Sequence, residues 1–191
     1  MTNIGIFASG NGTNAENIIS YFEASTKITI KLVLTNNADA YVLERIKPFN
    51  IDSFIFTGKE LLTTEKVLNK LKEYHIDFIV LAGFLLMVPE NILAAYPDKI
   101  INIHPALLPK YGGKGMYGMR VHQAVIDSKE RESGITIHYV NSRYDEGAII
   151  FQAKCDVLSE DTPETLANKI HQLEHSHFPK VIENVVYALK K

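Results

Sequence analysis

The chain has 191 residues, 46% of them hydrophobic and 22% charged, and its formal net charge at pH 7 is -2. The length favours one well-packed domain spanning residues 1–191, and the near-average composition and small charge give no indication of a nucleic-acid-binding or membrane protein. The single cysteine, Cys155, excludes an intrachain disulfide framework, and since the N-terminal sequence is unlike a signal peptide, the cytoplasm is the expected compartment.

Strands and helices are expected to alternate through the first hundred residues. The run Phe78–Ala82 is continuously apolar, which is typical of a parallel strand buried on both faces of a sheet. Apolar or β-branched runs, helical spacing and turn residues predict the other elements. The expected order is strand 4–8, helix 14–22, strand 28–34, helix 38–47, strand 53–56, helix 60–74, strand 78–82, a helix after Pro89 and strand 100–102. This alternation predicts an α/β fold with a doubly wound, mostly parallel sheet.

The second half of the chain begins with a glycine-rich loop. The elements expected after this loop are a helix over 120–127, two strands over 134–141 and 148–157 joined by a hairpin-length connection, and a closing helix over 164–189. In doubly wound sheets, ligands bind outside the carboxyl ends of the strands. The candidate site therefore comprises the polar segments that follow predicted strands, at residues 10–12, 83–84 and 102–104.

The segment Gly10-Asn11-Gly12-Thr13-Asn14-Ala15 fits the G-x-G-x-x-A pattern between a strand and a helix. Glycines allow close approach there, and free N–H groups at the helix start attract phosphate, so an anion site is favoured over a bare tight turn. A dinucleotide site would need an acidic residue at the end of the second strand. The chain has Thr35-Asn36-Asn37 there, and Asp39 comes slightly late. A single phosphate, of a mononucleotide or a sugar phosphate, is therefore the favoured ligand.

A pair of polar side chains follows Ile100-Ile101 at the end of a predicted strand. Side chains at i and i+2 leave the same face of extended backbone, so Asn102 and His104 can converge on one small group. They would form an oxyanion hole in which the histidine could also carry a proton. The alternative is a polar pair that satisfies backbone groups where the strand leaves the core. No serine, cysteine or lysine lies in an activating motif, so the substrate is the expected source of a nucleophile.

Asp145 lies in the connection between the last two predicted strands, within Tyr144-Asp145-Glu146-Gly147. A simple Asp-x-Gly turn and a catalytic carboxylate are about equally supported. A carboxylate near His104 would favour the imidazolium form and raise the pKa of the histidine.

Other histidines are less informative. His171 and His175 share a helix face, with His177 nearby, which suggests a metal site. No carboxylate or cysteine ligand stands clearly in register with them, so a solvated or substrate-facing helix is favoured. His138 lies on a predicted strand, where it either lines the cleft or faces solvent.

Six motifs occur in order over nearly the whole chain, at Ser9–Asn14, Asn37–Ala40, Leu81–Phe84, Asn102–Pro109, Asp145–Gly147 and Gln172–His175. In sequence and spacing they closely resemble the folate-dependent phosphoribosylglycinamide formyltransferase family. The resemblance implies a single Rossmann-like formyltransferase domain, with a phosphate-binding half over about 1–100 and a folate-binding and catalytic half over about 80–191. The chain departs from the family pattern at the long glycine-rich segment 112–120 and at His171, where many members have glutamine.

The resemblance also implies a reaction. The enzyme would transfer the formyl group of 10-formyltetrahydrofolate to the amine of glycinamide ribonucleotide in de novo purine biosynthesis, by direct attack and without a covalent enzyme adduct. Asn102 and protonated His104 would stabilise the oxyanion, and Asp145 would support the charged histidine and position water for proton transfer. The implied partners are these two small molecules, with no metal, nucleic acid or membrane, and the enzyme would be a monomer or a homodimer.

Binding residues follow from the same resemblance. Gly12, Thr13 and Asn14 would hold the ribonucleotide phosphate, and Glu174 would contact its ribose. The folate contacts would come from Asn102 together with Lys59, Leu85, Leu86, Met87 and Val88.

Two classes of protein are kept as alternatives. One is another enzyme that uses 10-formyltetrahydrofolate, such as a hydrolase or a different formyltransferase, although these usually carry a further domain. The other is a nonenzymatic nucleotide- or folate-binding module, which would keep the phosphate loop but would not need Asn102, His104 and Asp145. An assay of turnover with both substrates would distinguish the implied formyltransferase from these two alternatives.

Overall fold

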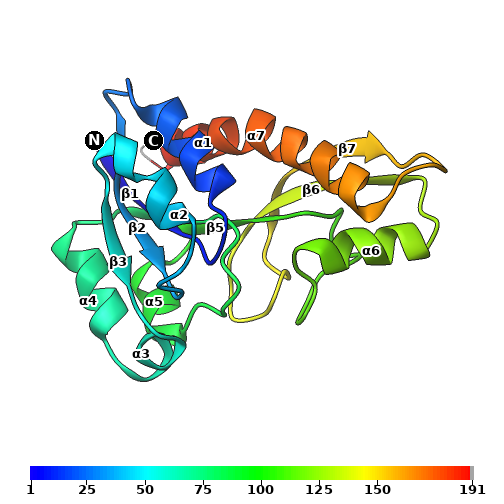
Figure 1. The fold of residues 1–191 in the computed structure, drawn as a ribbon. Coiled ribbons are helices and arrows are strands. Elements are labelled where there is room, and N and C mark those ends of the chain that lie inside the picture. Colours follow the sequence, from blue (N-terminus) through cyan, green and yellow to red (C-terminus); the bar gives the residue numbers. More distant parts are fainter. Residues whose placement is uncertain (190–191) are drawn as a thin grey trace.

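The computed structural model describes residues 1–189, which form one seven-stranded sheet covered by helices on both faces (Figure 1). The order of the strands is β3-β2-β1-β4-β5-β6-β7. Strands β1 to β5 pair in parallel, and β6 is antiparallel to β5 and β7. The strands are β1 (Thr2–Phe7), β2 (Ile28–Thr35), β3 (Asp52–Ile55), β4 (Phe78–Leu81), β5 (Ile100–His104), β6 (Glu132–Tyr139) and β7 (Ile149–Asp156). The predicted α/β fold with a doubly wound, mostly parallel sheet is confirmed.

The helices cover the two faces of the sheet in separate groups. Helices α1 and α7 pack on one face, and α3, α4 and α5 pack on the other (Figure 1). The helical segments are α1 (Thr13–Phe22), α2 (Val42–Arg45), the 3-10 helix η1 (Lys47–Phe49), α3 (Gly58–Thr63), α4 (Lys66–Glu73), α5 (Glu90–Ala95), α6 (Met119–Asp127) and α7 (Pro163–Ala188). No helix within residues 1–189 has the length and apolar character needed to cross a membrane.

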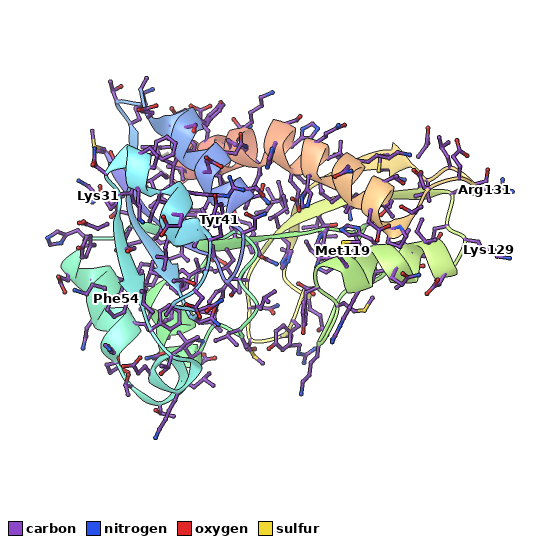
Figure 2. The ribbon with its side chains drawn as sticks, in the orientation of Figure 1. Lys31, Tyr41, Phe54, Met119, Lys129 and Arg131 are labelled. Carbon is purple, nitrogen blue, oxygen red and sulfur yellow. The ribbon has the colours of Figure 1, made fainter. Side chains whose placement is uncertain are left out.

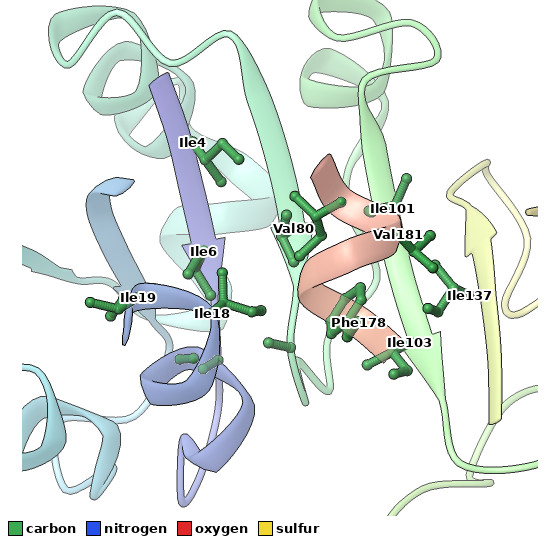
Figure 3. Packing of buried hydrophobic residues seen from close by; sticks show 14 of the residues in the cluster. Ile4, Ile6, Ile18, Ile19, Val80, Ile101, Ile103, Ile137, Phe178 and Val181 are labelled. Carbon is green, nitrogen blue, oxygen red and sulfur yellow. The ribbon is translucent and has the colours of Figure 1, made fainter. Parts of the chain in front are cut away.

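Alternate side chains of the central strands divide between two cores. Ile4 and Ile6 of β1 and Val80 of β4 pack with Ile18 of α1 and Phe178 of α7 (Figure 3). The opposite core contains the intervening strand residues and the inner faces of the other helices, among them Phe7, Ile79, Leu61, Leu71 and Ile92. Burying one such large apolar side chain contributes about 1.5–3 kcal/mol. Packing on both faces therefore fixes the carboxyl ends of β1, β4 and β5 beside one another.

The helix expected over residues 38–47 is shorter and later. Only Val42–Arg45 are α-helical, and Pro48 lies within η1. The Asp39 N–H donates to Asn37 Oδ1 at 3.0 Å, and the Val42 N–H donates to a carbonyl of the β1–α1 loop at 3.1 Å. The residues expected in the first helical turn therefore form a local turn and a contact with the neighbouring loop, and the helix begins later.

The helix expected over residues 60–74 is two helices, α3 and α4. Thr64 takes an extended conformation, and its Oγ1 donates to the Glu60 carbonyl at 2.6 Å. This side-chain donor satisfies a carbonyl at the end of α3 and ends the helix. Leu61 and Leu71 both still reach the core, which explains why their spacing suggested one continuous helix.

Strand β5 is longer than the expected strand 100–102. Its pairing with β6 places Asn102 opposite His138 and His104 opposite Thr136. Both candidate polar side chains therefore lie on a paired strand and not in the following loop. From residue 119 onward, the helices and strands begin and end within two residues of their expected bounds.

Candidate active site

A cavity of about 610 Å³ opens at the carboxyl ends of the central strands. The loop 10–14 lines one part of it, and Asn102, His104 and Asp145 line another. The rest of the wall comes from residues 82–85, the loop 113–118, and the side chains of His122, His171 and Glu174. A cavity of this size accommodates a typical small-molecule ligand. Motifs that lie far apart in the sequence thus face one space.

The turn between β1 and α1 requires glycine at position 12. Gly12 has a φ of 78°, in the left-handed region that favours glycine, and a Cβ there would lie 2.8 Å from the Cα of Val42. Gly12 is the N-cap of α1 and supplies no capping side chain. The first backbone N–H groups of α1, at Thr13 and Asn14, therefore remain available at the cavity wall. Such a helix start is suited to an anion.

Two side chains that sequence analysis did not identify hold this loop in place. Arg45 of α2 donates from Nε to the Asn11 carbonyl at 2.8 Å. Ser9 donates from Oγ to Asn36 Oδ1 at 2.6 Å and accepts from the Leu85 N–H at 3.0 Å. Ser9 therefore ties together the segments that follow β1, β2 and β4. No pattern in the sequence indicated the partner of Arg45, because α2 and the loop meet only in the fold.

A buried polar cluster lies between the loop and α7. Glu174 is 5% exposed, and its Oε2 accepts from Asn14 Nδ2 at 2.8 Å and from His171 Nδ1 at 2.9 Å. The hydrogen bond that His171 donates to Glu174 is the main cause that raises the pKa of His171 above its usual value. Since the Asn14 amide donates to Glu174, the backbone N–H of Asn14 is the group that remains for an anion. His171 lines the cavity, whereas His175 is exposed and does not line it.

Asn102 is oriented by a histidine on the neighbouring strand. His138 is 2% exposed, and its Nδ1 lies 2.8 Å from the Tyr139 carbonyl oxygen. Because a carbonyl only accepts, Nδ1 carries a proton, and because the Asn102 Nδ2 group only donates, Nε2 is the acceptor of that hydrogen bond at 3.2 Å. One N–H of Asn102 is thereby fixed, and the other is left for the cavity. The sequence alternation left open whether His138 faces the cleft or solvent, and the structure buries it beside Asn102 in the wall of a small cavity.

Both ring nitrogens of His104 have protein neighbours. Nε2 donates to the Tyr111 carbonyl at 2.7 Å, and Nδ1 lies 3.6 Å from Asp145 Oδ2. Burial lowers the pKa of His104 below its usual 6.5, although Asp145 and the Tyr111 carbonyl act to raise it. The expected raised pKa is therefore wrong as a net direction, because the desolvation of a ring that is only 3% exposed outweighs the carboxylate. His104 is therefore neutral at pH 7, with its proton on Nε2.

Asp145 lies in a turn and also lines the cavity, so the two interpretations of this segment are compatible. Its backbone has a φ of 56°. Oδ2 accepts from the Gly113 N–H at 2.9 Å, and Oδ1 lies 3.6 Å from His138 Nε2. Burial raises the pKa of Asp145, but the His138 and His104 rings and the Gly113 N–H together hold it below its usual value. Asp145 is therefore an ionised carboxylate that faces two imidazole rings.

The glycine-rich segment 112–120 supplies residues 113–118 to the cavity wall. Gly113 and Gly115 have φ of 95° and 90°, which explains why this segment is rich in glycine. Tyr117 is 41% exposed, and Met119 is 47% exposed at the start of α6 (Figure 2). The segment thus adds an aromatic side chain, Tyr117, to a cavity wall that also includes the apolar residues Phe84 and Leu85.

The segment Leu85–Val88 lies between the main cavity and a smaller one of about 60 Å³. Leu85 lines the main cavity. The following residues 86–88 line the smaller cavity, whose wall also includes Asn102 and Asp145. Leu85 and Met87 are 47% and 40% exposed. Large apolar side chains exposed beside a cavity indicate a ligand surface.

Some residues considered from the sequence lie outside both cavities. Lys59 is exposed on α3, although a Cβ at the preceding Gly58 would lie 3.5 Å from Leu86 Cδ1. Asp39 is also exposed, so no acidic residue supports a dinucleotide site. The His177 ring packs 5.0 Å from a phenylalanine ring of β7. In residues 1–189, no group of three or more histidine, cysteine or acidic side chains is arranged to hold a metal ion.

The match to known proteins identifies the family of this site. A family model described as formyl transferase matches residues 2–182. The chain belongs to the formyl transferase family. This membership confirms the resemblance seen in the motifs, the expected class of enzyme and a folate-type co-substrate.

Two similar proteins have names that are consistent with this family. The chain is 35% identical to phosphoribosylglycinamide formyltransferase of Bacillus subtilis (strain 168), with 97% of this chain and 95% of the relative covered. It is 37% identical to the chloroplastic phosphoribosylglycinamide formyltransferase of Arabidopsis thaliana, with 94% of this chain and 63% of the relative covered. The chain thus spans just under two thirds of the plant relative.

Solved structures of formyl transferases have the same fold. The crystal structure of phosphoribosylglycinamide formyltransferase from Bacillus halodurans has a TM-score of 0.87 and 36% identity to this chain, and the match covers 97% of this chain and 95% of that one. The enzyme from Streptococcus pneumoniae TIGR4 has a TM-score of 0.84 and 32% identity, and the match covers 97% and 99% of the two chains. These matches confirm a single Rossmann-like formyltransferase domain.

For this formyl transferase, the substitution Asp145→Asn is expected to lower the pKa of His104 further. The carboxylate charge opposes the effect of burial, and the substitution removes the charge while burial remains. Ring resonances of His104, followed by NMR against pH, should therefore titrate at lower pH in the variant. Glu146→Gln, which changes an exposed partner of Arg143, is the matched control and should leave the midpoint unchanged. An unchanged or higher midpoint in Asp145→Asn would contradict the pairing.

Proposed function

We propose that the chain transfers the formyl group of 10-formyltetrahydrofolate to the amine of glycinamide ribonucleotide, a step of de novo purine biosynthesis. The observation that carries this proposal is a single cavity onto which both an open helix start and the cluster of Asn102, His104 and Asp145 face. A substrate whose phosphate is held at the helix start can extend its amine toward the cluster. Relatives named phosphoribosylglycinamide formyltransferase support this choice of substrate.

In the proposed complex the ribonucleotide binds mainly to the half of the domain within about residues 1–100, together with α7. Gly12 allows close approach, and the N–H groups of Thr13 and Asn14 hold the phosphate at the positive end of the α1 dipole. Glu174 accepts from the ribose through Oε1, because Asn14 and His171 both donate to Oε2. A protonated His171 also offsets the charge of Glu174 beside the phosphate dianion.

The folate binds to the half within about residues 80–191. The apolar segment Leu85–Val88 lines its pterin ring, and the smaller cavity brings that ring beside Asn102. Lys59 lies near this segment, because the preceding Gly58 packs against Leu86. Its ammonium group provides a cation for the carboxylates at the end of the folate that is remote from the pterin ring.

The reaction begins when the neutral amine of the ribonucleotide attacks the formyl carbon. The carbonyl oxygen becomes an oxyanion, and the N–H of Asn102 that His138 leaves free donates to it. The amine then loses a proton, N10 of the folate gains one through water held by Asp145, and the bond between the formyl carbon and N10 breaks. The products are the formylated ribonucleotide and tetrahydrofolate, with no net change in protons and no bond to the protein.

His104 contributes by exchanging one hydrogen-bond acceptor for another. Its Nε2–H donates to the Tyr111 carbonyl, and in the proposed complex the formyl oxygen takes the place of that carbonyl. Gly112 and Gly113 directly follow Tyr111 and give the peptide freedom to move. Nδ1 takes the proton that the attacking amine loses and faces Asp145 at 3.6 Å, so the carboxylate stabilises the imidazolium until a proton passes through water to N10.

The test is an assay of the purified chain with both substrates. We expect formylated ribonucleotide and tetrahydrofolate to appear in equal amounts, with no tetrahydrofolate released when the ribonucleotide is omitted. Release of tetrahydrofolate and formate without formylated ribonucleotide would indicate a hydrolase. Binding of either substrate without turnover would indicate a binding module. Either result would refute the proposed function.

A further inference from the structure

His122 is a buried histidine that the mechanism above does not use. It lies on α6, is 3% exposed and lines the main cavity. Its Nδ1 is fully buried and has no hydrogen-bond partner among residues 1–189. Burial lowers the pKa of His122, so the ring is neutral at pH 7. An unpaired buried polar atom is uncommon in a folded protein and points to a role outside packing.

The unpaired nitrogen indicates where His122 carries its proton. A neutral imidazole has one N–H donor and one acceptor nitrogen. Folded proteins tolerate an unpaired buried acceptor more readily than an unpaired buried N–H, so Nδ1 is the acceptor. Only Nδ1 of the two ring nitrogens is sealed from solvent without a partner, so Nε2–H is the group that His122 presents to the cavity.

His122 shares the main cavity with residues of both ends of the proposed ribonucleotide site. His104, His171 and Glu174 line the same cavity and lie close enough to His122 to act on its pKa. Glu174 is hydrogen-bonded to Asn14 of the phosphate loop, so its end of the cavity holds the phosphate and the ribose. The part of the ribonucleotide that passes His122 is therefore the glycinamide arm, which joins the ribose to the reacting amine.

We propose that the Nε2–H of His122 donates to the carbonyl oxygen of the glycinamide arm and thereby positions the amine for attack. This inference rests on the proposed function. A carbonyl oxygen only accepts hydrogen bonds, which suits an N–H donor, whereas the ribose hydroxyls can donate to the carboxylate of Glu174. Since the amine is one carbon away from this carbonyl, fixing the carbonyl restricts where the amine can point.

The substitution His122→Phe tests the proposal because it keeps a planar ring and removes both nitrogens. The Kd for glycinamide ribonucleotide, measured by calorimetry, is expected to rise about three- to tenfold, the effect of losing one neutral hydrogen bond. The thermal unfolding temperature is expected to stay the same or rise, because an unpaired buried atom is lost. In His122→Gln, whose amide keeps an N–H donor, the Kd is expected to stay within about twofold of wild type.

Ribose 5-phosphate, which lacks the glycinamide arm, is the control ligand. Its Kd is expected to be the same for wild type and His122→Phe. If His122→Phe raised the Kd of both ligands equally, His122 would contact the ribose and not the glycinamide arm. If His122→Phe and His122→Gln raised the Kd of the ribonucleotide equally, the effect would come from packing and not from a hydrogen bond. Either result, or an unchanged Kd in His122→Phe, would overturn the proposal. Binding of the ribonucleotide by wild type without formyl transfer would refute the proposed function alone, whereas no binding by wild type would refute both.

Discussion

Replacing Asn102 by alanine is expected to lower kcat by about a hundred- to a thousandfold, the usual effect of losing one oxyanion donor. His138 accepts one N–H of the Asn102 amide, so the other is already aimed into the cavity before substrate binds. This donor becomes important only as charge develops on the formyl oxygen, so KM should change much less than kcat. Steady-state kinetics with each substrate varied in turn measures the two effects separately.

The companion variants His104→Ala and Asp145→Ala are expected to lose turnover as well, while they keep the fold and phosphate binding. His175→Ala is the matched control, because this histidine lies on α7 close to the site in sequence but is exposed and outside the cavity. Circular dichroism and ribose 5-phosphate binding would show that each variant is folded. Near-normal turnover in Asn102→Ala, His104→Ala or Asp145→Ala would remove that residue from the proposed machinery.

The substitution Gly12→Ala is expected to impair both stability and ribonucleotide binding. A left-handed φ of 78° and a Cβ placed 2.8 Å from the Cα of Val42 both oppose any side chain at this position. Together they should lower the free energy of unfolding by about 2–4 kcal/mol. To relieve the clash, the loop must move away from α2, which displaces the N–H groups at the start of α1. We therefore expect KM for the ribonucleotide to rise at least tenfold, since about 1.4 kcal/mol of lost binding has that effect.

Gly10→Ala is the control for this prediction because it lies in the same loop. A Cβ at Gly10 would have no heavy atom within 4 Å, so its effect on unfolding should stay within about 0.5 kcal/mol. Urea denaturation and steady-state kinetics of the two variants provide the comparison. If Gly12→Ala kept the unfolding free energy and the ribonucleotide KM of wild type, the helix start would not be the phosphate site.

The helices and strands were predictable from the sequence where a clear run or spacing of apolar residues determines the element. The apolar run Phe78–Ala82 predicted the buried centre of the sheet, and the long apolar spacing after residue 163 predicted α7. Prediction was wrong where side chains compete with the helix backbone. Thr64 ends α3 through a hydrogen bond to its own helix, and the turn at Asn37 delays α2. Such local choices depend on neighbours in space, so the helical spacing of apolar residues does not reveal them.

The candidate site was predictable to the extent that it follows strand ends. The loop at Gly12 and the pair Asn102 and His104 lie at the carboxyl edge of the sheet, as the alternation of elements required. The partners that orient them were not predictable. His138 reaches Asn102 only through the antiparallel register of β5 and β6, and Arg45 reaches the loop 10–14 from another helix. The net pKa of His104 also depends on burial, which its neighbours in sequence do not determine.

The proposed reaction moves a formyl group directly from folate to the ribonucleotide amine within this cavity. A single-turnover reaction with 10-formyltetrahydrofolate carrying a carbon-13 label in its formyl group tests it most directly. With the wild-type chain, all of the label should appear on the amine of glycinamide ribonucleotide, at the rate at which tetrahydrofolate forms and with none bound to protein. Label recovered as formate or as a protein adduct would contradict direct transfer.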